Sequence, residues 1–238
     1  MRRFRTSREE STSRGVLMTT QSYSVRTPRI VGSDGAETVR RLVDVLACVV
    51  LLVLLVVPLL LIILAIRLEG SGPALFRQER VGLRGQRFTL LKFRTMFQGV
   101  DDRALRDLIA RELRGENTVD GGSSKLNNDR RITRVGSILR RTSLDELPQL
   151  FNVLRGDMTL VGPRPCLGWE AEMFPAEFTP RFEVRPGLTG LWQVSGRSAL
   201  GTLEMLELDV RYVRSRSLQS DLGILIRTVP ALLGSGAR

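Results

Sequence analysis

VLACVVLLVLLVVPLLLIILAI, residues 45–66, is an apolar run without a charged side chain. A helix rises ~1.5 Å per residue, so about 22 residues span roughly 33 Å, enough to cross the hydrocarbon core of a bilayer. The run starts well inside the chain and lacks a small-residue cleavage site, unlike a secretory signal peptide. We therefore predict a membrane-inserted helix around which the rest of the chain must fold.

Pro58 lies inside this run, where a proline removes one helical hydrogen bond and kinks the helix. Basic residues flank both ends of the run, with Arg40 and Arg41 before it and Arg67 directly after it. Positive charge favours the cytoplasmic side of a membrane. A straight span would leave one basic flank outside, whereas a helix that bends at Pro58 and returns keeps both inside. The sequence favours this re-entrant hairpin, and the straight span is the alternative.

One acidic side chain, Asp44, stands at the entrance to the apolar run. A carboxylate in that position is costly unless it has a partner. Arg40 and Arg41 precede it by about one helical turn, so we expect one of them to pair with it.

The composition limits the chemistry that this chain can perform. The formal net charge is +11, and nearly all basic residues are arginine. This bias is either a property of the genome or a sign of a phosphate-rich partner, because guanidinium groups bind phosphate oxygens in pairs. The chain has no histidine and two cysteines without metal-binding spacing. Histidine-assisted nucleophiles are thereby excluded and a soft-metal site is disfavoured, so carboxylates and arginines must perform any catalysis.

The sequence beyond the apolar run predicts a small, mostly helical α+β domain. Residues 1–36 are rich in Ser, Thr and Arg and are expected to be disordered, and residues 115–129 read as a polar loop. The expected elements are a β-hairpin within 73–96, helices over 101–115, 133–141 and 147–154, a turn leading into a strand over 185–193, and helices over 203–212 and 218–233.

The last predicted helix carries a regular apolar stripe. Its members are Leu218, Leu222, Leu225, Val229 and Leu232. Such a stripe most often faces a protein core. Because the chain also has a membrane run, a helix lying on the bilayer surface is the alternative.

The segment RRTSLDELPQL, residues 140–150, sets two adjacent carboxylates beside two arginines. Pro148 belongs in the first turn of a helix, so Asp145 is placed to cap that helix, with Glu146 favourably near its positive end. A helix N-terminus also attracts phosphate, and an ionised Asp145 can attack phosphorus without a histidine base. The residues themselves leave the structural and the catalytic interpretation open.

A second anion-binding feature follows at GPRP, residues 162–165. Two prolines hold Arg164 in a preset direction, which lowers the entropy cost of binding an anion. An ordinary surface turn is the alternative. Since the chain has no Gly-rich phosphate-binding loop, side chains must grip any phosphate ligand.

The order of these motifs over residues 40–230 resembles the bacterial sugar transferase family, the monotopic phosphoglycosyl transferases that act on polyprenyl phosphate. The matching segments are RLVD (41–44), GPALFRQERVG (72–82), LKFRTM (91–96), TRVG (133–136), DELPQ (145–149), GDMTLVGPRP (156–165) and RPGLTG (185–190). So many ordered motifs make a chance match very improbable, and they favour the catalytic interpretation of Asp145.

The resemblance implies that a UDP-sugar gives its sugar phosphate to polyprenyl (undecaprenyl) phosphate with release of UMP. The implied mechanism is a ping-pong reaction with Mg²⁺, and the implied product is the first lipid-linked sugar of a polysaccharide or glycoconjugate. Asp145 would attack the β-phosphate and form a phosphosugar intermediate. Glu146 would orient it or, together with Asp145, hold the metal. Arg140 would bind the polyprenyl phosphate and Arg164 the phosphates of the nucleotide-sugar.

Further residues are given roles on the same resemblance. We expect Arg141, Lys92 and Arg94 to contribute to substrate binding. Arg41, Asp44 and Pro58 would serve the membrane-inserted segment. No role is assigned to Asp129 or Asp157.

The resulting expectation is an α+β protein with a disordered tail (1–36), a membrane-inserted re-entrant helix broken at proline (37–67) and a catalytic domain (68–238) with a β-hairpin and amphipathic interfacial helices. It would lie at the cytoplasmic face of a bacterial inner membrane and bind a UDP-sugar, a polyprenyl phosphate and the bilayer but no nucleic acid, and a homodimer stays open. The alternative is a non-catalytic, membrane-anchored protein that binds polyanions; such a protein gains nothing from two acids inside its basic patch. A direct glycosyltransferase that releases UDP would differ in its leaving nucleotide.

Overall fold

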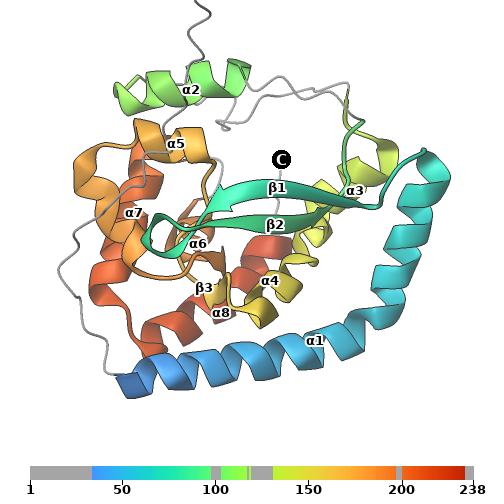
Figure 1. Cartoon of the computed structure of the whole chain (residues 1–238), viewed down its shortest axis with the longest axis horizontal. Coiled ribbons are helices and arrows are strands. Elements are labelled where there is room, and N and C mark those ends of the chain that lie inside the picture. The colour runs from blue at the N-terminus through green and yellow to red at the C-terminus, as the bar shows by residue number, and fades with distance from the viewer. Residues whose placement is uncertain (1–33, 98–102, 117, 119–130, 197–199, 234–238) are drawn as a thin grey trace, which may run out of the picture.

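The computed structural model describes residues 34–97, 103–116, 118, 131–196 and 200–233. It is mostly helical with two small sheets (Figure 1). The predicted disordered tail, apart from residues 34–36, lies outside the described residues. Most of the predicted loop over 115–129 lies outside them as well.

The apolar run forms the middle of one long helix, α1 (Asp34–Glu69). Only 6% of its most apolar window is buried against the rest of the protein, so it is not the core helix of a soluble domain. The helix passes through Pro58 without an interruption of its assigned helical structure. Figure 1 shows it running along the lower edge of the molecule and then bending upward toward the hairpin. Its long apolar character is confirmed, and the re-entrant path through a bilayer stays a prediction.

The predicted β-hairpin is confirmed. Strands β1 (Leu75–Val81) and β2 (Arg87–Phe93) pair antiparallel, from Leu75 opposite Phe93 to Val81 opposite Arg87. The single 3₁₀ turn η1 (Leu83–Gly85) connects them. Gly85 has a φ of 76°, the left-handed conformation for which glycine is favoured.

The middle of the chain contains α2 (Arg103–Leu113), α3 (Arg134–Thr142), the 3₁₀ turn η2 (Leu144–Glu146) and α4 (Gln149–Arg155). The predicted helices here are confirmed to within a few residues. The Thr133 hydroxyl caps α3 by accepting the Gly136 N–H at 2.8 Å, and Gly156, with a φ of 89°, ends α4. Gly136 is required by packing, because a Cβ there would lie 2.1 Å from the Thr95 carbonyl oxygen.

The C-terminal part consists of β3 (Thr159–Val161), α5 (Gly168–Met173), η3 (Ala176–Glu183), β4 (Gly187–Thr189), α6 (Leu191–Ser195), α7 (Thr202–Ser215) and α8 (Leu218–Leu233). Strands β3 and β4 pair in parallel. The expected strand over 185–193 is only partly confirmed, because α6 begins at Leu191. Leu191 and Val194 both pack on the main core, and their spacing places them on one face of a helix rather than of a strand.

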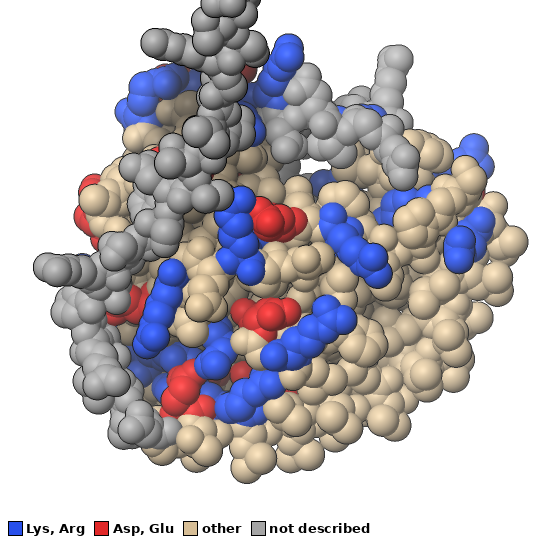
Figure 2. All heavy atoms as spheres, viewed as in Figure 1, with Lys and Arg blue, Asp and Glu red and all other residues tan. Residues whose placement is uncertain are grey.

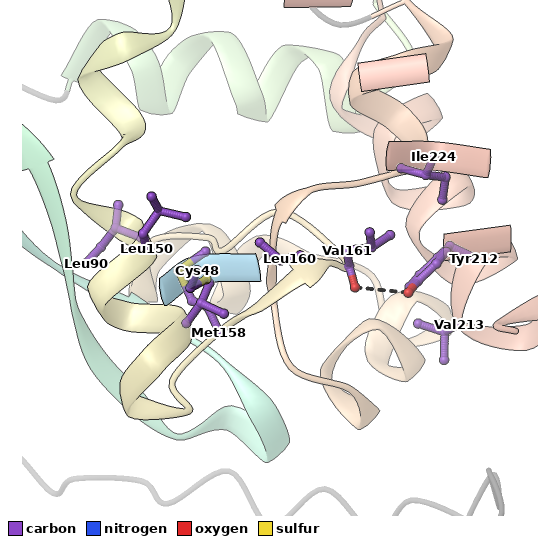
Figure 3. Packing of buried hydrophobic residues seen from close by; sticks show 10 residues of the cluster. Cys48, Leu90, Leu150, Met158, Leu160, Val161, Tyr212, Val213 and Ile224 are labelled. Atoms are coloured by element: carbon purple, nitrogen blue, oxygen red, sulfur yellow. Dashed lines mark hydrogen bonds between the residues drawn. The ribbon is translucent and has the colours of Figure 1, made fainter. Parts of the chain in front are cut away.

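The main core joins α1, the hairpin, α4, β3 and the last two helices (Figure 3). Its buried members are Cys48, Leu90, Leu150, Val153, Met158, Leu160, Val161, Tyr212, Val213 and Ile224. The Tyr212 hydroxyl lies 3.0 Å from the Val161 carbonyl oxygen and 2.7 Å from the Asp221 carboxylate, so its polar atom is satisfied inside this core. A second cluster of Ile66, Ala74, Phe93 and Leu139 packs the other end of α1 onto the hairpin and α3.

Polar contacts fix the first turns of α1 to the same domain. The Arg40 guanidinium donates to Asp221 of α8 at 2.7 Å, and Arg41 donates to the Val153 and Leu154 carbonyl oxygens at 2.5 and 2.7 Å. These arginines therefore reach α8 and the end of α4.

The prediction that Asp44 pairs with Arg40 or Arg41 is wrong. Asp44 instead accepts the Thr159 hydroxyl at 2.6 Å and the Leu160 N–H at 3.1 Å. The start of β3 thus supplies the partners that the sequence analysis expected from an arginine.

The prediction that the apolar stripe of α8 faces the protein core is also wrong for most of its residues. The side chains of Leu218, Leu222 and Val229 are 43%, 59% and 58% exposed. The buried face is carried instead by Asp221 and Ile224. The buried face thus lies to the side of the predicted stripe, because Asp221 is drawn inward by its bonds to Arg40 and Tyr212.

Candidate functional site

The two predicted catalytic carboxylates lie on the short link between α3 and α4. Ser143, with a φ of 55°, ends α3 in the left-handed conformation, and Leu144–Glu146 then form η2. Pro148 stands at the N-cap of α4, and no side chain caps that helix. Asp145 is therefore not engaged as a helix cap, which removes the structural interpretation of this residue.

Lys92 of β2 faces both carboxylates. Its ammonium nitrogen lies 2.7 Å from Oε1 of Glu146 and 3.9 Å from Oδ2 of Asp145. The side chains of Asp145 and Glu146 are 14% and 31% exposed, so Asp145 is the more enclosed of the two. The structure thus brings the predicted residues Asp145, Glu146 and Lys92 into one cluster.

A buried asparagine holds β2 against α4 and so fixes this cluster. Asn152 of α4 accepts the Leu91 N–H at 3.0 Å and donates to the Thr89 carbonyl at 2.7 Å. Its amide also donates to Asp157 at 3.1 Å. Asp157, which had no role from sequence, thus orients Asn152, and Asn152 sets the backbone next to Lys92.

The surroundings of Asp145 act on its charge in opposite directions. Burial raises the pKa of Asp145, and the neighbouring Glu146 raises it too, while Lys92 and Arg140 lower it. The net pKa is above the ordinary value for an aspartate. Lys92 is the strongest influence that keeps this carboxylate ionised.

A pocket opens beside Glu146 and Lys92. Its lining residues are Arg80, Leu90, Lys92, Glu146, Gln149, Arg164, Pro165, Gly187, Leu188 and Gln193. Three of them are cationic and one is acidic. Since Lys92 already binds Glu146, the lining has an excess of positive charge suited to an anionic ligand.

Arg164 extends from the predicted rigid turn, and its backbone is held by a buried ion pair. Arg181 donates to the Arg164 carbonyl oxygen at 2.8 Å and to Asp209 at 2.7 Å. Both charged side chains are 1% exposed. The Arg164 guanidinium lies over the Trp192 ring, 5.5 Å from its centroid. The turn is thus braced from inside while its arginine lines the pocket.

The other predicted basic residues lie in different places. Arg140 and Arg141 are exposed in the last turn of α3, and the charge of Arg140 acts on Asp145. Arg94 donates to the carbonyl oxygens of Ile66 and Gly70 at 3.1 and 2.8 Å, as well as to that of Ser71. Arg94 therefore fixes the end of α1 in this structure, and its role in substrate binding stays a prediction.

Sequence reasoning gave no site role to seven residues of the pocket, and those with the largest side chains are Arg80, Leu90, Gln149, Leu188 and Gln193. Arg80, Gln149 and Leu188 lie inside the motifs quoted for the resemblance, and Gln193 follows the last motif by three residues. The signal was present, but nothing in a single sequence shows that β1, α4, β4 and α6 meet at one hollow.

Mg²⁺ fits the donor set at the carboxylate pair. Within the part of the chain that the structure describes, no group of three or more acidic, histidine or cysteine side chains could hold a metal by itself. Mg²⁺ is usually bound by one or two carboxylates together with substrate phosphates and water. Asp145 and Glu146 supply two adjacent carboxylates next to a cationic pocket, which matches that pattern.

Comparison with known proteins relates the whole described chain to one group. A family model for bacterial sugar transferases matches residues 35–235. The chain is similar to the UDP-glucose:undecaprenyl-phosphate glucose-1-phosphate transferase of Caulobacter vibrioides, with 46% identity over 202 residues that cover 82% of this chain and 69% of the relative. It is 41% identical over 200 residues to the exopolysaccharide production protein ExoY of Rhizobium meliloti, covering 81% and 84%. It is 37% identical over 225 residues to the galactosyl transferase CpsE of Streptococcus agalactiae, covering 93% of this chain but 49% of that protein.

Proposed function

This chain belongs to the bacterial sugar transferase family, and from that premise we propose that it transfers a sugar phosphate from a UDP-sugar to polyprenyl (undecaprenyl) phosphate and releases UMP. The names of the relatives support an undecaprenyl-phosphate acceptor, and the ExoY relative supports a place in exopolysaccharide production. These names include both glucose and galactose, so the sugar is left unassigned.

The observation that carries the proposal is the environment of Asp145. Its carboxylate caps no helix, is largely enclosed and faces Lys92, beside a pocket with two further cations. A carboxylate can serve as a nucleophile toward phosphorus when neighbouring cations offset the repulsion between the two negative groups. A protein that only binds polyanions has no use for two adjacent acids inside its basic patch.

The proposed reaction has two displacements at one phosphorus atom. An oxygen of Asp145 attacks the β-phosphorus of the UDP-sugar, the bond to the bridging oxygen breaks, and its electron pair leaves with UMP. An oxygen of the polyprenyl phosphate then attacks the same phosphorus and expels Asp145 as a free carboxylate. No proton transfer is required at either step if both phosphates arrive ionised, which suits a chain without histidine.

The cationic residues take separate roles in this scheme. Lys92 keeps Asp145 and Glu146 neutralised before the donor enters. Arg164 binds the donor phosphates, and Arg140, exposed at the end of α3, binds the phosphate of the lipid. Asp145 and Glu146 would also hold Mg²⁺, which would neutralise charge on the diphosphate.

We also propose that α1 enters and leaves the membrane on the cytoplasmic side. Cys48 and Ile66, near the two ends of the apolar run, belong to core clusters of the same domain. A domain on one side of a bilayer cannot bury both ends of a helix that crosses it. The bend in Figure 1 agrees with a helix that returns.

The first test measures nucleotide release by the detergent-purified chain with Mg²⁺, undecaprenyl phosphate and a panel of UDP-sugars. We expect lipid-dependent UMP release that falls by ~10³-fold or more in Asp145→Asn. The matched control is Asp107→Asn, which removes an exposed carboxylate of α2 and should leave the rate unchanged. Release of UDP instead of UMP would support a direct glycosyltransferase, and equal release by Asp145→Asn would refute the nucleophile.

A further inference from the structure

Arg80 of β1 is an enclosed cation whose hydrogen-bonding capacity is only partly used. Its side chain is 11% exposed and lines the pocket together with Arg164. It donates to the Pro165 carbonyl oxygen at 3.3 Å and to the Gln78 side chain at 2.6 Å. Its Nε–H is buried and has no hydrogen-bond partner. A guanidinium offers five N–H groups, so Arg80 retains donors for a ligand.

The charges around Arg80 do not balance it well. The neighbouring Glu170 carboxylate lies 3.7 Å away, beyond hydrogen-bonding distance, and it also accepts the Leu167 N–H. Burial, followed by the like charge of Arg164, lowers the pKa of Arg80 to about 10. Arg80 is still charged at neutral pH, but its surroundings disfavour that charge. A bound anion between the two guanidinium groups would remove this penalty.

The walls of the pocket restrict what that anion can be. Leu90 and Leu188 give it apolar surface, and Gln149 and Gln193 give it amides. Behind this lining, the Trp192 ring lies against the Arg164 guanidinium and so limits where that side chain can go. A phosphate joined to a flat, hydrogen-bonding group fits these walls better than a bare phosphate does.

We propose that Arg80 and Arg164 form a subsite for a nucleoside monophosphate, with Arg80 binding the phosphate of the departing nucleotide. The assignment rests on the proposed function, which makes UMP the leaving group. When the bond between the β-phosphorus and the bridging oxygen breaks, the electron pair stays on the nucleotide phosphate and its negative charge increases. The unused donors of Arg80 meet that charge as it develops, which favours departure.

The test is a direct binding measurement that does not depend on turnover. The detergent-solubilised full chain is titrated with UMP in the presence of Mg²⁺ by calorimetry. The variants are Arg80→Gln, Arg80→Lys and the control Arg77→Gln. Arg77 is an exposed residue of the same strand three positions earlier, so its side chain leaves the opposite face of β1.

We expect Arg80→Gln to weaken UMP binding by roughly 10–100-fold, the effect of losing a hydrogen bond to a charged group. Arg77→Gln should bind like the unaltered chain. Arg80→Lys should recover part of the affinity, because it keeps the charge and loses the fork of donors. Thermal unfolding of each variant shows whether it is folded, and the lysine variant keeps the test valid if the glutamine variant is not.

Two results overturn the subsite. One is an equal UMP affinity of the unaltered chain and both Arg80 variants, and the other is no UMP binding by the unaltered chain. Either can occur while lipid-dependent UMP release still depends on Asp145, in which case the transferase stands and the subsite falls. The converse result is UMP binding that depends on Arg80 without any release of UMP from UDP-sugars. It would mean that the subsite stands and the proposed transfer reaction falls.

Discussion

Asp145 must be ionised to attack phosphorus, and its enclosure opposes ionisation. Because the pKa of Asp145 is raised in the folded protein, the ionised fraction, and with it the rate, should fall on the acid side at a pH higher than for an ordinary aspartate. Lys92 is the strongest opposing influence. Removing its charge should therefore move this acid limb further toward higher pH.

We predict this shift for Lys92→Gln, measured as the pH dependence of kcat/KM for UMP release. Lys92→Arg should restore the limb because the positive charge is kept. If Lys92 acted only by binding the donor, Lys92→Gln would raise KM at every pH and leave the shape of the profile unchanged.

The Arg181–Asp209 pair makes a second residue-scale prediction. Asp209→Ala should lower the free energy of unfolding by about 3–5 kcal/mol, because it leaves the Arg181 guanidinium buried and uncompensated. The pair also holds the Arg164 backbone, so donor KM should rise even in molecules that remain folded. Chemical denaturation and initial rates measure the two effects.

The matched comparison is Glu207→Ala, which truncates a less buried acid of the same helix α7. It should change the free energy of unfolding by no more than about 0.5 kcal/mol and leave the donor KM unchanged. A loss of stability in Asp209→Ala without any change in donor KM would show that the pair supports the fold but not the turn.

At the same scale, the sequence predicted the kind of chemistry at the site better than it predicted which residues line the site. Asp145, Glu146 and Lys92 do meet, and Arg164 lines the adjacent pocket. Arg80 was missed because a strand arginine looks exposed until the Pro165 turn folds over it. Arg94 was assigned to substrate because the sequence does not show that the end of α1 returns to it.

At the scale of elements, local signals were reliable wherever the backbone itself sets the structure. Thr133 caps the start of α3 and Gly156 ends α4, as capping rules predict, and Gly85 takes the left-handed conformation in the hairpin turn. Predictions of which helix face is buried were less reliable. The apolar spacing of α8 cannot show that Asp221 points inward to meet Arg40. Tertiary ion pairs decide such a rotation, and they are invisible in local periodicity.

The path of α1 gives the prediction at this scale. Gly35 lies in the first turn of α1 and Ser71 follows its last residue by two positions, and both are exposed. In cells, single cysteines introduced as Gly35→Cys and Ser71→Cys should both resist a membrane-impermeant maleimide and both react once the membrane is permeabilised. The native Cys48 and Cys166 are buried and provide an unlabelled background. Reaction of one introduced cysteine in intact cells would show that α1 spans the bilayer.

On the scale of the whole molecule, α1 forms an apolar edge beside a charged body. Figure 2 shows acidic and basic side chains interspersed across the centre of one face, and an uncharged area at the lower right, where α1 runs in Figure 1. The exposed apolar residues of α1 include Leu46, Val53, Leu54, Leu60 and Leu61. This arrangement would keep the phosphate-binding residues in water while the apolar edge enters lipid.

The same helix also completes the interior of the catalytic domain. The expected boundary between a membrane segment ending at residue 67 and a separate domain from residue 68 does not express this. Cys48 is fully buried in the main core and Ile66 is buried in the second cluster. Removing a large buried side chain such as Ile66 typically costs about 2–5 kcal/mol. The removal of α1 also leaves the carbonyl oxygens at the end of α4 without the Arg41 donors.

We therefore predict that a fragment of residues 70–238 does not fold as an independent domain. It should show no cooperative thermal transition by circular dichroism and should bind no UMP in detergent. A fragment of residues 34–238, which retains α1, is the control and should unfold with the same midpoint as the full chain. Cooperative unfolding of the 70–238 fragment near that midpoint would mean that α1 is a dispensable anchor. Loss of the transition would mean that membrane insertion and assembly of the site depend on the same helix. The structural reason is that α1 packs against α4, and Asn152 of α4 fixes β2, the strand that carries Lys92.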